Sequence, residues 1–219
     1  MKEIVDSLTS RFADKKCLVI GGPVVPLVPL AKQLLQVGAQ RPLLLSNGVG
    51  TGDLPEEDTA TWHSLDVPKT SSVAVAFREY EALLVEPDVA TQEVVEAYDP
   101  EGEALALGAI VLNDVPSVAG RRRYAYRPAA WRELEDKTRV EGLWSEAGIA
   151  APPALVVPCA PEALRDASRS LDRGAGVVWA GDSRDGVHGG GQFVRWVRNA
   201  TQEQEAFVEL SGSCDRLRV

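Results

Sequence analysis

Val-Val-Trp-Ala-Gly-Asp-Ser-Arg-Asp-Gly-Val-His-Gly-Gly-Gly, at residues 177–191, is the stretch that decides the fold. The alternating segment 192–198 follows it at once, and alternation of this kind predicts a strand. The whole therefore reads as strand, glycine loop, strand. Glycines allow positive φ and close approach of a ligand, and successive free N–H groups suit a phosphate. A plain hairpin connection is the competing interpretation, because glycine-rich turns between strands are ordinary.

Helix and strand signals surround this stretch in the second half of the chain. Asp136 is a candidate N-cap for a helix whose apolar residues recur at helical spacing: Val140, Leu143, Trp144 and Ala147. Pro161 opens a second helix, and Thr201 with Gln204 forms a capping box for a third. Further strands are expected at residues 153–158 and 216–219. The predicted order is α-β-α-β-loop-β-α-β.

The first half begins with a β-α-β pattern. Residues 16–20 form an apolar run, leucines recur at helical spacing from Leu27 to Leu35, and residues 42–46 form the next run. A crossover helix joins parallel strands, so this pattern predicts a parallel, Rossmann-like pair. Further strands are expected at residues 72–77 and 109–112, with a short helix at 78–85 after the first of them.

Composition and charge limit the classes of function. The 219 residues carry a formal charge of −9, which argues against duplex binding, because phosphate neutralisation needs clustered cations. Three cysteines without Cys-x-x-Cys spacing and two histidines disfavour a disulfide framework, a zinc site and a Ser-His-Asp triad. We expect a soluble cytoplasmic protein that handles small ligands, with no nucleic-acid or membrane partner and with a homo-oligomer left open.

One basic cluster, residues 121–127, contains four arginines and two tyrosines. Arginines on a short loop can pair with carboxylates or phosphates. A solvated loop is the favoured interpretation of this cluster.

The element order resembles that of the ATP-grasp family. The resemblance also rests on Leu-Glu-Asp-Lys at residues 134–137, Gly-Ile-Ala-Ala-Pro-Pro at residues 148–153, and the glycine loop itself. More closely, the chain is similar to bacterial ATP-grasp ligases in which a Rossmann-like domain precedes the nucleotide-binding lobe. The resemblance spans most of residues 110–219 and covers residues 1–110 loosely.

The resemblance implies an α/β fold with two parts. Residues 1–128 would form a Rossmann-like pre-ATP-grasp domain, and residues 129–219 would form the first α+β lobe of an ATP-grasp domain, with the second lobe absent. It also implies an ADP-forming carboxylate–amine ligase that uses ATP and Mg²⁺. In that reaction ATP phosphorylates a small carboxylate substrate, and an amine displaces phosphate from the acyl phosphate.

Site residues follow from the same resemblance. Lys137 matches the family's first phosphate-binding lysine. The glycine loop of the family is matched by Gly186, His188, Gly189, Gly190 and Gly191. Without the resemblance, Lys137 reads as an exposed lysine near a helix start. No catalytic residue and no metal ligand is assigned, because the magnesium ligands are expected in the missing lobe.

Two departures from the family pattern stand out. The family's second lysine ends the strand before the glycine loop, whereas residues 178–181 read Val-Trp-Ala-Gly, and Trp179 reads as a core residue. Arg184 is a weak substitute, because a guanidinium differs from an ammonium in geometry. The sequence also stops at Val219, after one lobe, so we expect this chain alone to be incomplete as a catalyst.

Two other functions remain open at this stage. One is a non-catalytic nucleotide-binding or regulatory module that keeps half of a nucleotide fold. The other is an NAD(P)-binding oxidoreductase built on the early β-α-β unit and on Gly48, Gly50 and Gly52. The oxidoreductase is disfavoured, because no acidic ribose ligand follows a glycine turn at the expected distance.

Overall fold

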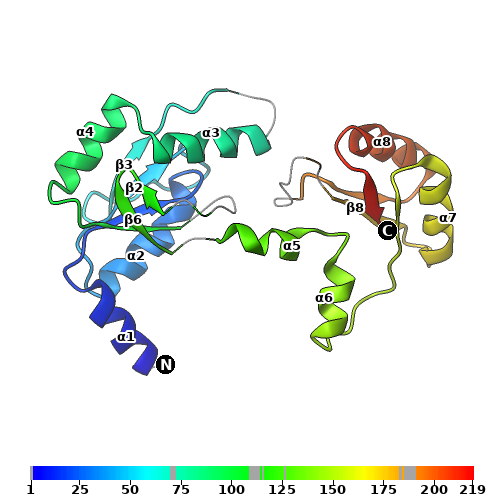
Figure 1. Ribbon diagram of the computed structural model, residues 1–219, viewed down its shortest axis with the longest axis horizontal. Coiled ribbons are helices and arrows are strands. Elements are labelled where there is room, and N and C mark those ends of the chain that lie inside the picture. The colour runs from blue at the N-terminus through cyan, green and yellow to red at the C-terminus, as the bar shows by residue number, and fades with distance from the viewer. Residues whose placement is uncertain are drawn as a thin grey trace. The chain divides into compact units, whose positions relative to one another are not determined.

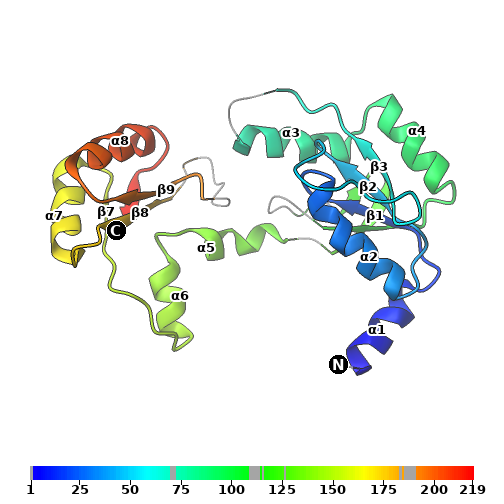
Figure 2. The same ribbon diagram turned by 180° about the vertical axis from the view of Figure 1, so that it is seen from behind.

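The protein is a mixed α/β chain that forms two compact units, Met1–Ala129 (unit 1) and Ala130–Val219 (unit 2). The computed structural model describes residues 2–69, 73–108, 114, 116–125, 127–182, 184 and 191–219. Figures 1 and 2 show the two units from opposite sides. Among the described residues, no helix is long and apolar enough to cross a membrane.

Unit 1 is built on a six-stranded sheet with the order β3-β2-β1-β4-β6-β5. The pairs β1–β2, β1–β4, β2–β3 and β4–β6 are parallel, and β5–β6 is an antiparallel hairpin. The strands are β1 (Cys17–Ile20), β2 (Leu43–Ser46), β3 (Thr61–Ser64), β4 (Leu105–Leu107), β5 (Ser117–Val118) and β6 (Arg121–Ala125). The helical segments are α1 (Lys2–Phe12), η1 (Val25–Leu27), α2 (Val28–Gln36), α3 (Val73–Val85) and α4 (Val89–Tyr98).

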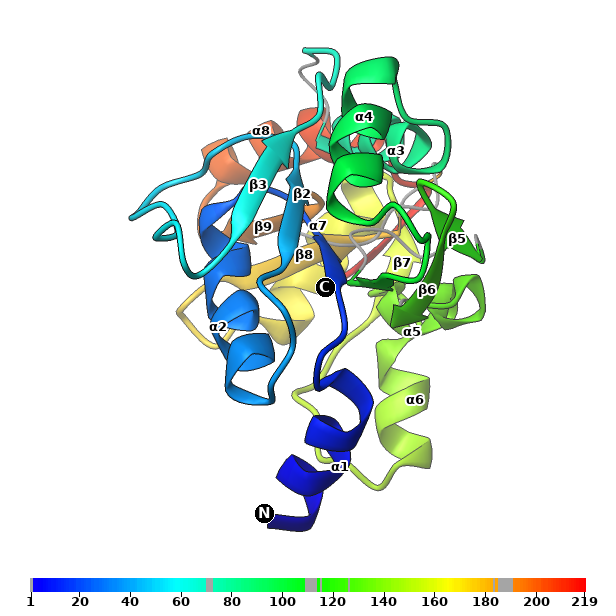
Figure 3. The ribbon, with the colours of Figure 1, turned by 90° about the vertical axis from the view of Figure 1, so that its left-hand side faces the viewer.

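Helices cover both faces of this sheet, as the side view shows (Figure 3). One apolar cluster joins one face of the strands to α3 and α4 through Leu18, Leu45, Tyr80, Leu84 and Val95. The other joins the opposite face to α1 and α2 through Phe12, Val19, Ala31, Leu34 and Leu44. All residues of β1 and β2 are buried, as expected for strands covered on both sides. The predicted parallel β-α-β pair is confirmed by the register Leu18↔Leu43.

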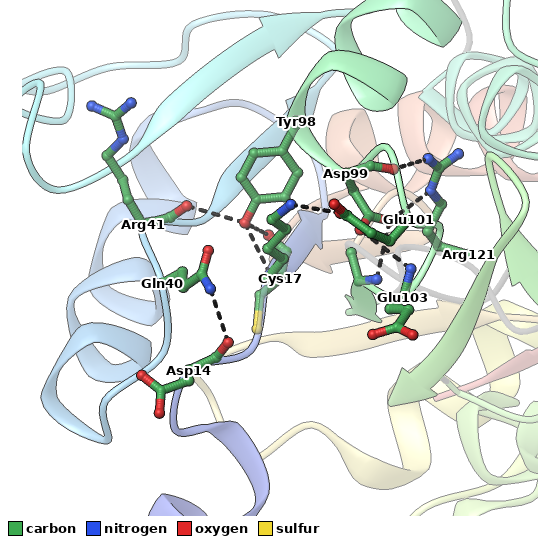
Figure 4. Close-up of polar contacts among 11 residues, drawn as sticks. Asp14, Cys17, Gln40, Arg41, Tyr98, Asp99, Glu101, Glu103 and Arg121 are labelled. Atoms are coloured by element: carbon green, nitrogen blue, oxygen red, sulfur yellow. Dashed lines mark hydrogen bonds and ion pairs between the residues drawn. The ribbon is translucent and has the colours of Figure 1, made fainter.

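Two tyrosines from consecutive helices join β1 to β2 at both ends. The Tyr80 hydroxyl donates to the Leu45 carbonyl at 2.5 Å and accepts from the Gly21 N–H at 3.1 Å. The Tyr98 hydroxyl donates to the Arg41 carbonyl and accepts from the Cys17 N–H, both at 3.0 Å (Figure 4). Burial raises the pKa of Tyr98 to about 12, so this hydroxyl keeps its proton over the physiological range.

Two predictions for unit 1 are wrong. Residues 73–77, expected in a strand, begin helix α3 instead. The Val-Ala-Val-Ala alternation spans only four residues, and alanine favours helices, whereas the buried Tyr80, Glu81 and Leu84 lie at helical spacing. The strand expected at residues 109–112 lies outside the described residues.

The basic cluster is the second error, because residues 121–125 form strand β6 rather than a solvated loop. Arg121 is buried against Asp99, with Nε 2.9 Å from Oδ2 (Figure 4). Arg123 is buried against Glu81, with Nη2 2.8 Å from Oε2. These two arginines therefore form buried ion pairs inside unit 1.

Unit 2 contains a four-stranded antiparallel sheet with the order β7-β10-β8-β9. Helices α7 and α8 supply Leu164, Ala167, Ala206 and Leu210 to one apolar cluster with the strand residues Val177, Trp179, Val197 and Leu217. The strands are β7 (Val156–Pro158), β8 (Val177–Gly181), β9 (Val194–Val197) and β10 (Arg216–Arg218). The helical segments are η2 (Ala129–Trp131), α5 (Arg132–Glu135), α6 (Val140–Glu146), α7 (Pro161–Leu171) and α8 (Ala200–Ser211).

The predicted element order of unit 2 is confirmed, but two helix starts differ. Asp136 follows α5 and caps a turn, where its carboxylate accepts from the N–H and hydroxyl of Thr138, both at 2.8 Å. The next helix, α6, starts only at Val140. The N-cap of α8 is Asn199, whose side chain accepts from the Gln202 N–H at 3.0 Å, so the predicted Thr201 cap is wrong by two residues.

Candidate functional site

The carboxyl end of β8 leads into the glycine loop. Its last residue, Gly181, has no room for a side chain. Trp179 is fully buried, and its Nε1 donates to the Ser168 hydroxyl at 2.9 Å. A Cβ at Gly181 would lie 2.3 Å from Sγ of Cys214. The strand therefore ends in core residues, and the glycine is required by the cysteine packed against it.

Lys137 lies near this strand end, in the turn between α5 and α6. Asp136 stabilises its charged form, and Cys214, the residue packed on Gly181, lies near enough to do the same when its thiol is ionised. Partial burial lowers the pKa of Lys137, against the opposing effect of Asp136. Burial raises the pKa of Cys214 to about 12, so at neutral pH the neighbouring sulfur is an uncharged thiol. The amine is thus a partly dehydrated cation, which interacts more strongly with an anion than a fully hydrated one does.

A chain of hydrogen bonds joins the Lys137 turn to the sheet. Arg216 of β10 donates from Nη2 to the Thr138 hydroxyl at 3.2 Å, and its Nε lies 3.7 Å from Oδ2 of Asp182. Oδ1 of Asp182 accepts from the backbone N–H groups of Asp215 and Arg216, at 3.0 and 3.2 Å. Asp182 directly follows β8, so the first residue of the glycine loop and the Lys137 turn are attached to the same strand, β10.

Arg184 binds the C-terminal end of α8. Its Nε donates to Asp215 at 2.6 Å, and its Nη atoms donate to the carbonyls of Gly212 and Ser211, both at 3.1 Å. Those carbonyls lie at the C-terminal end of α8, where cations are favourable. Arg184 is therefore a helix-capping residue in this structure, and it does not replace the strand lysine.

The predicted loop residues are described only at one end. Gly186, His188, Gly189 and Gly190 lie outside the described residues. Gly191 lies in the turn before β9, with φ +71, a conformation that favours glycine. Of the predicted site residues, the structure thus describes Lys137 and Gly191.

The sequence analysis missed Arg216, Asp182 and Cys214 as neighbours of Lys137. Each of them contacts the site across 33 to 78 positions of sequence separation, so no local spacing marks them. The alternation in residues 216–218 predicted only a strand.

In the first β-α turn of unit 1, three backbone N–H groups already donate hydrogen bonds within the protein. The N–H groups of Gly21, Val24 and Val25 donate to Tyr80, Gly48 and Val49 respectively. Pro26 and Pro29, within η1 and at the start of α2, carry no N–H. A pyrophosphate in a dinucleotide fold binds such donors, so this geometry disfavours the NAD(P) interpretation.

The glycines of the loop after β2 have a packing role. A Cβ at Gly50 would lie 2.8 Å from the Pro23 side chain, and a Cβ at Gly52 would lie 2.8 Å from the Val25 side chain. These glycines let two loops pack closely.

Within the described ranges, no group of three or more His, Cys, Asp or Glu side chains could hold a metal ion.

No protein-family model matches the chain, and no curated protein matches it. Among solved structures, N5-carboxyaminoimidazole synthetase from Staphylococcus aureus complexed with ADP is similar to it, with 15% identity and a TM-score of 0.42. The match covers 94% of this chain and 46% of that enzyme, so the chain spans about half the length of the enzyme. A similarity of this extent does not by itself assign a function.

Proposed function

We propose that unit 2 binds the phosphates of ATP and supplies this lobe to an ADP-forming carboxylate–amine ligase. The observation that carries the proposal is the placement of Lys137. Its partly dehydrated ammonium lies in the neighbourhood of Cys214, which packs on the last residue of β8. Arg216 attaches the Lys137 turn to the strand that also holds Asp182, the first residue of the glycine loop. Phosphoryl transfer depends mainly on positioning and on neutralisation of charge, which such a lysine supplies.

In this proposal the two units are the pre-ATP-grasp domain and the first lobe of an ATP-grasp fold. Lys137 neutralises phosphate charge, and residues 186–191 cover the phosphates with backbone N–H groups. Mg²⁺ accompanies the nucleotide, and no residue of this chain is proposed as its ligand. The whole enzyme would form an acyl phosphate from a small carboxylate and transfer the acyl group to an amine in the cytoplasm.

The test is ATP binding by Lys137→Gln, measured by isothermal titration calorimetry with MgATP. Loss of one charge-assisted contact is expected to weaken binding about tenfold or more. The matched control is Lys32→Gln, because Lys32 lies exposed on α2 of unit 1. Equal MgATP affinity of the Lys137→Gln variant and the wild type would contradict the role of Lys137.

One observation favours a second candidate, a nucleotide-binding regulatory module without turnover. The strand before the glycine loop ends in the buried residues Trp179, Ala180 and Gly181 and offers no cation for transfer chemistry. A regulatory module predicts saturable MgATP binding without release of ADP in the presence of carboxylates and amines. Because this chain alone is expected to be incomplete as a catalyst, a coupled assay for ADP release separates the two candidates only in a protein that also carries a second lobe, where the ligase predicts release and the module predicts none.

A further inference from the structure

Helix α1 has an apolar face that unit 1 covers only at one end. Phe12 is 7% exposed and belongs to the core, whereas Val5 and Leu8 are 46% and 40% exposed. These residues lie on one side of the helix, at spacings of three and four. The helix therefore presents an apolar strip to solvent along its first two turns.

This strip forms one wall of a groove of about 830 Å³. Helix α2 forms the opposite wall, and the end of β4 and Tyr124 of β6 complete the lining. The apolar lining residues are Val5, Leu8, Phe12, Leu30, Leu34, Val37 and Leu107. Ligand sites in proteins are typically concave, mostly apolar and of this size, with a few polar groups that fix orientation.

The polar side of the lining is unusual, because Arg11 is the one charged residue among the described residues that line the groove. Its Nη1 donates to the Tyr124 hydroxyl at 2.8 Å. The Tyr124 ring is in turn held edge-to-face against Phe12, with the ring centres 5.4 Å apart. A guanidinium carries five N–H donors, so a single bond to tyrosine leaves donors that suit a carboxylate.

We propose that this groove binds a single-chain carboxylate, with its head group on Arg11 and its apolar chain along α1. Leu8 and Val5 lie about one and two turns before Arg11, so the chain contacts about 9 Å of helix beyond the head group. Among the described residues of the lining, none has an acidic side chain that would oppose an anion. The site belongs to unit 1 and is independent of the nucleotide site proposed for unit 2.

The test is calorimetric titration of the full chain with decanoate, and with decanol as the uncharged analogue. The wild type should bind both, and decanoate more tightly. Arg11→Gln is expected to weaken decanoate about tenfold and leave decanol unchanged. Leu8→Glu is expected to weaken both ligands about tenfold or more. Ser10→Glu, at an exposed position outside the lining, is the matched control and should bind as the wild type does.

Several results would overturn the proposal. These are absence of saturable decanoate binding, equal losses from Leu8→Glu and Ser10→Glu, and equal losses of decanoate and decanol in Arg11→Gln. Sedimentation velocity tests the alternative that a second copy of the chain fills the groove. If the chain dimerises, Leu8→Glu abolishes the dimer and decanoate does not compete, then the groove belongs to a second copy and the proposal is wrong. Circular dichroism of each variant checks that α1 and the rest of the chain remain folded.

Discussion

Gly181 offers a quantitative test of the packing at the end of β8. A methyl group there would lie 2.3 Å from Sγ of Cys214 and 3.0 Å from Cδ2 of Leu217. Both neighbours belong to the buried core of unit 2, so they have little room to move. Overpacking of this kind typically costs about 1 to 3 kcal/mol, and we expect Gly181→Ala to fall in the upper half of that range.

Removal of the sulfur should relieve most of this cost. Cys214→Ala alone should lose about 1 kcal/mol of burial free energy. In the double variant the nearest atoms to the new methyl group are Leu217 Cδ2 at 3.0 Å and the Cβ at position 214 at 3.2 Å, so some crowding remains. The double-mutant cycle should therefore show a favourable coupling of at least about 1 kcal/mol.

Urea unfolding followed by tryptophan fluorescence measures these changes, because Trp179 lies buried in the same strand. The matched control is Gly212→Ala, where an added Cβ meets nothing within 4 Å and φ is −68. The reasoning is refuted if Gly181→Ala costs no more than the control, or if the two substitutions at 181 and 214 are additive. It follows that a lysine grafted at position 181 would be tolerated only after the cysteine is shortened.

Two further predictions concern single interactions. Arg121 donates to the Asp99 carboxylate at 2.9 Å, to the Asp99 carbonyl at 2.5 Å and to the Ala119 carbonyl at 2.8 Å, so Arg121→Met should cost about 3 to 5 kcal/mol in hydrogen-exchange stability of β6. Burial raises the pKa of Asp99. The hydrogen bonds from Arg121 and from the Ala104 and Glu103 N–H groups lower it by more than burial raises it, so the pKa lies below the ordinary 3.8. This carboxylate therefore contributes stability above pH 3.8, and the contribution is lost as the pH falls through its lower folded pKa. Acid unfolding of the Arg121→Met variant should begin at a higher pH than acid unfolding of the wild type. Asn199→Ala should cost about 1 kcal/mol in urea unfolding through loss of the α8 cap, whereas Thr201→Ala should cost clearly less, and the reverse order would contradict the assigned cap.

Unit 2 was more predictable than unit 1, because its signals are local. Pro161 starts helix α7, and the alternating segment after Gly191 forms β9, as the sequence indicates. Unit 1 contains elements whose identity depends on distant partners. Arg121 and Arg123 read as a solvated cluster, because a charge is buried only when it is paired, and their carboxylates lie 22 and 42 positions away.

The candidate site shows the same division. Lys137 was assigned through the resemblance to the ATP-grasp family, carried in part by Leu-Glu-Asp-Lys at residues 134–137, whereas its local pattern alone indicates an exposed lysine near a helix start. Its connection through Thr138 to Arg216 depends on pairing between the turn and the last strand, 78 positions away. The helix expected at residues 78–85 is confirmed within α3, but its first residues, 73–77, were missed, and the packing of Tyr80 and Leu84 with Leu18 and Leu45 favours the helix over a short strand.

The two tyrosine bridges of unit 1 have a consequence for how the sheet is assembled. Gly21 directly follows β1 and is four residues after Cys17, and Arg41 lies just before β2 and is four residues before Leu45. The two hydroxyls therefore match the strands only when β1 and β2 pair in one alignment. A shift of one residue would leave the fully buried Tyr80 hydroxyl without its partners, at a cost of about 1 to 3 kcal/mol, and would also break the bonds of the partly exposed Tyr98 hydroxyl. The tyrosines of α3 and α4 thus stabilise one alignment of β1 with β2 over the alternatives.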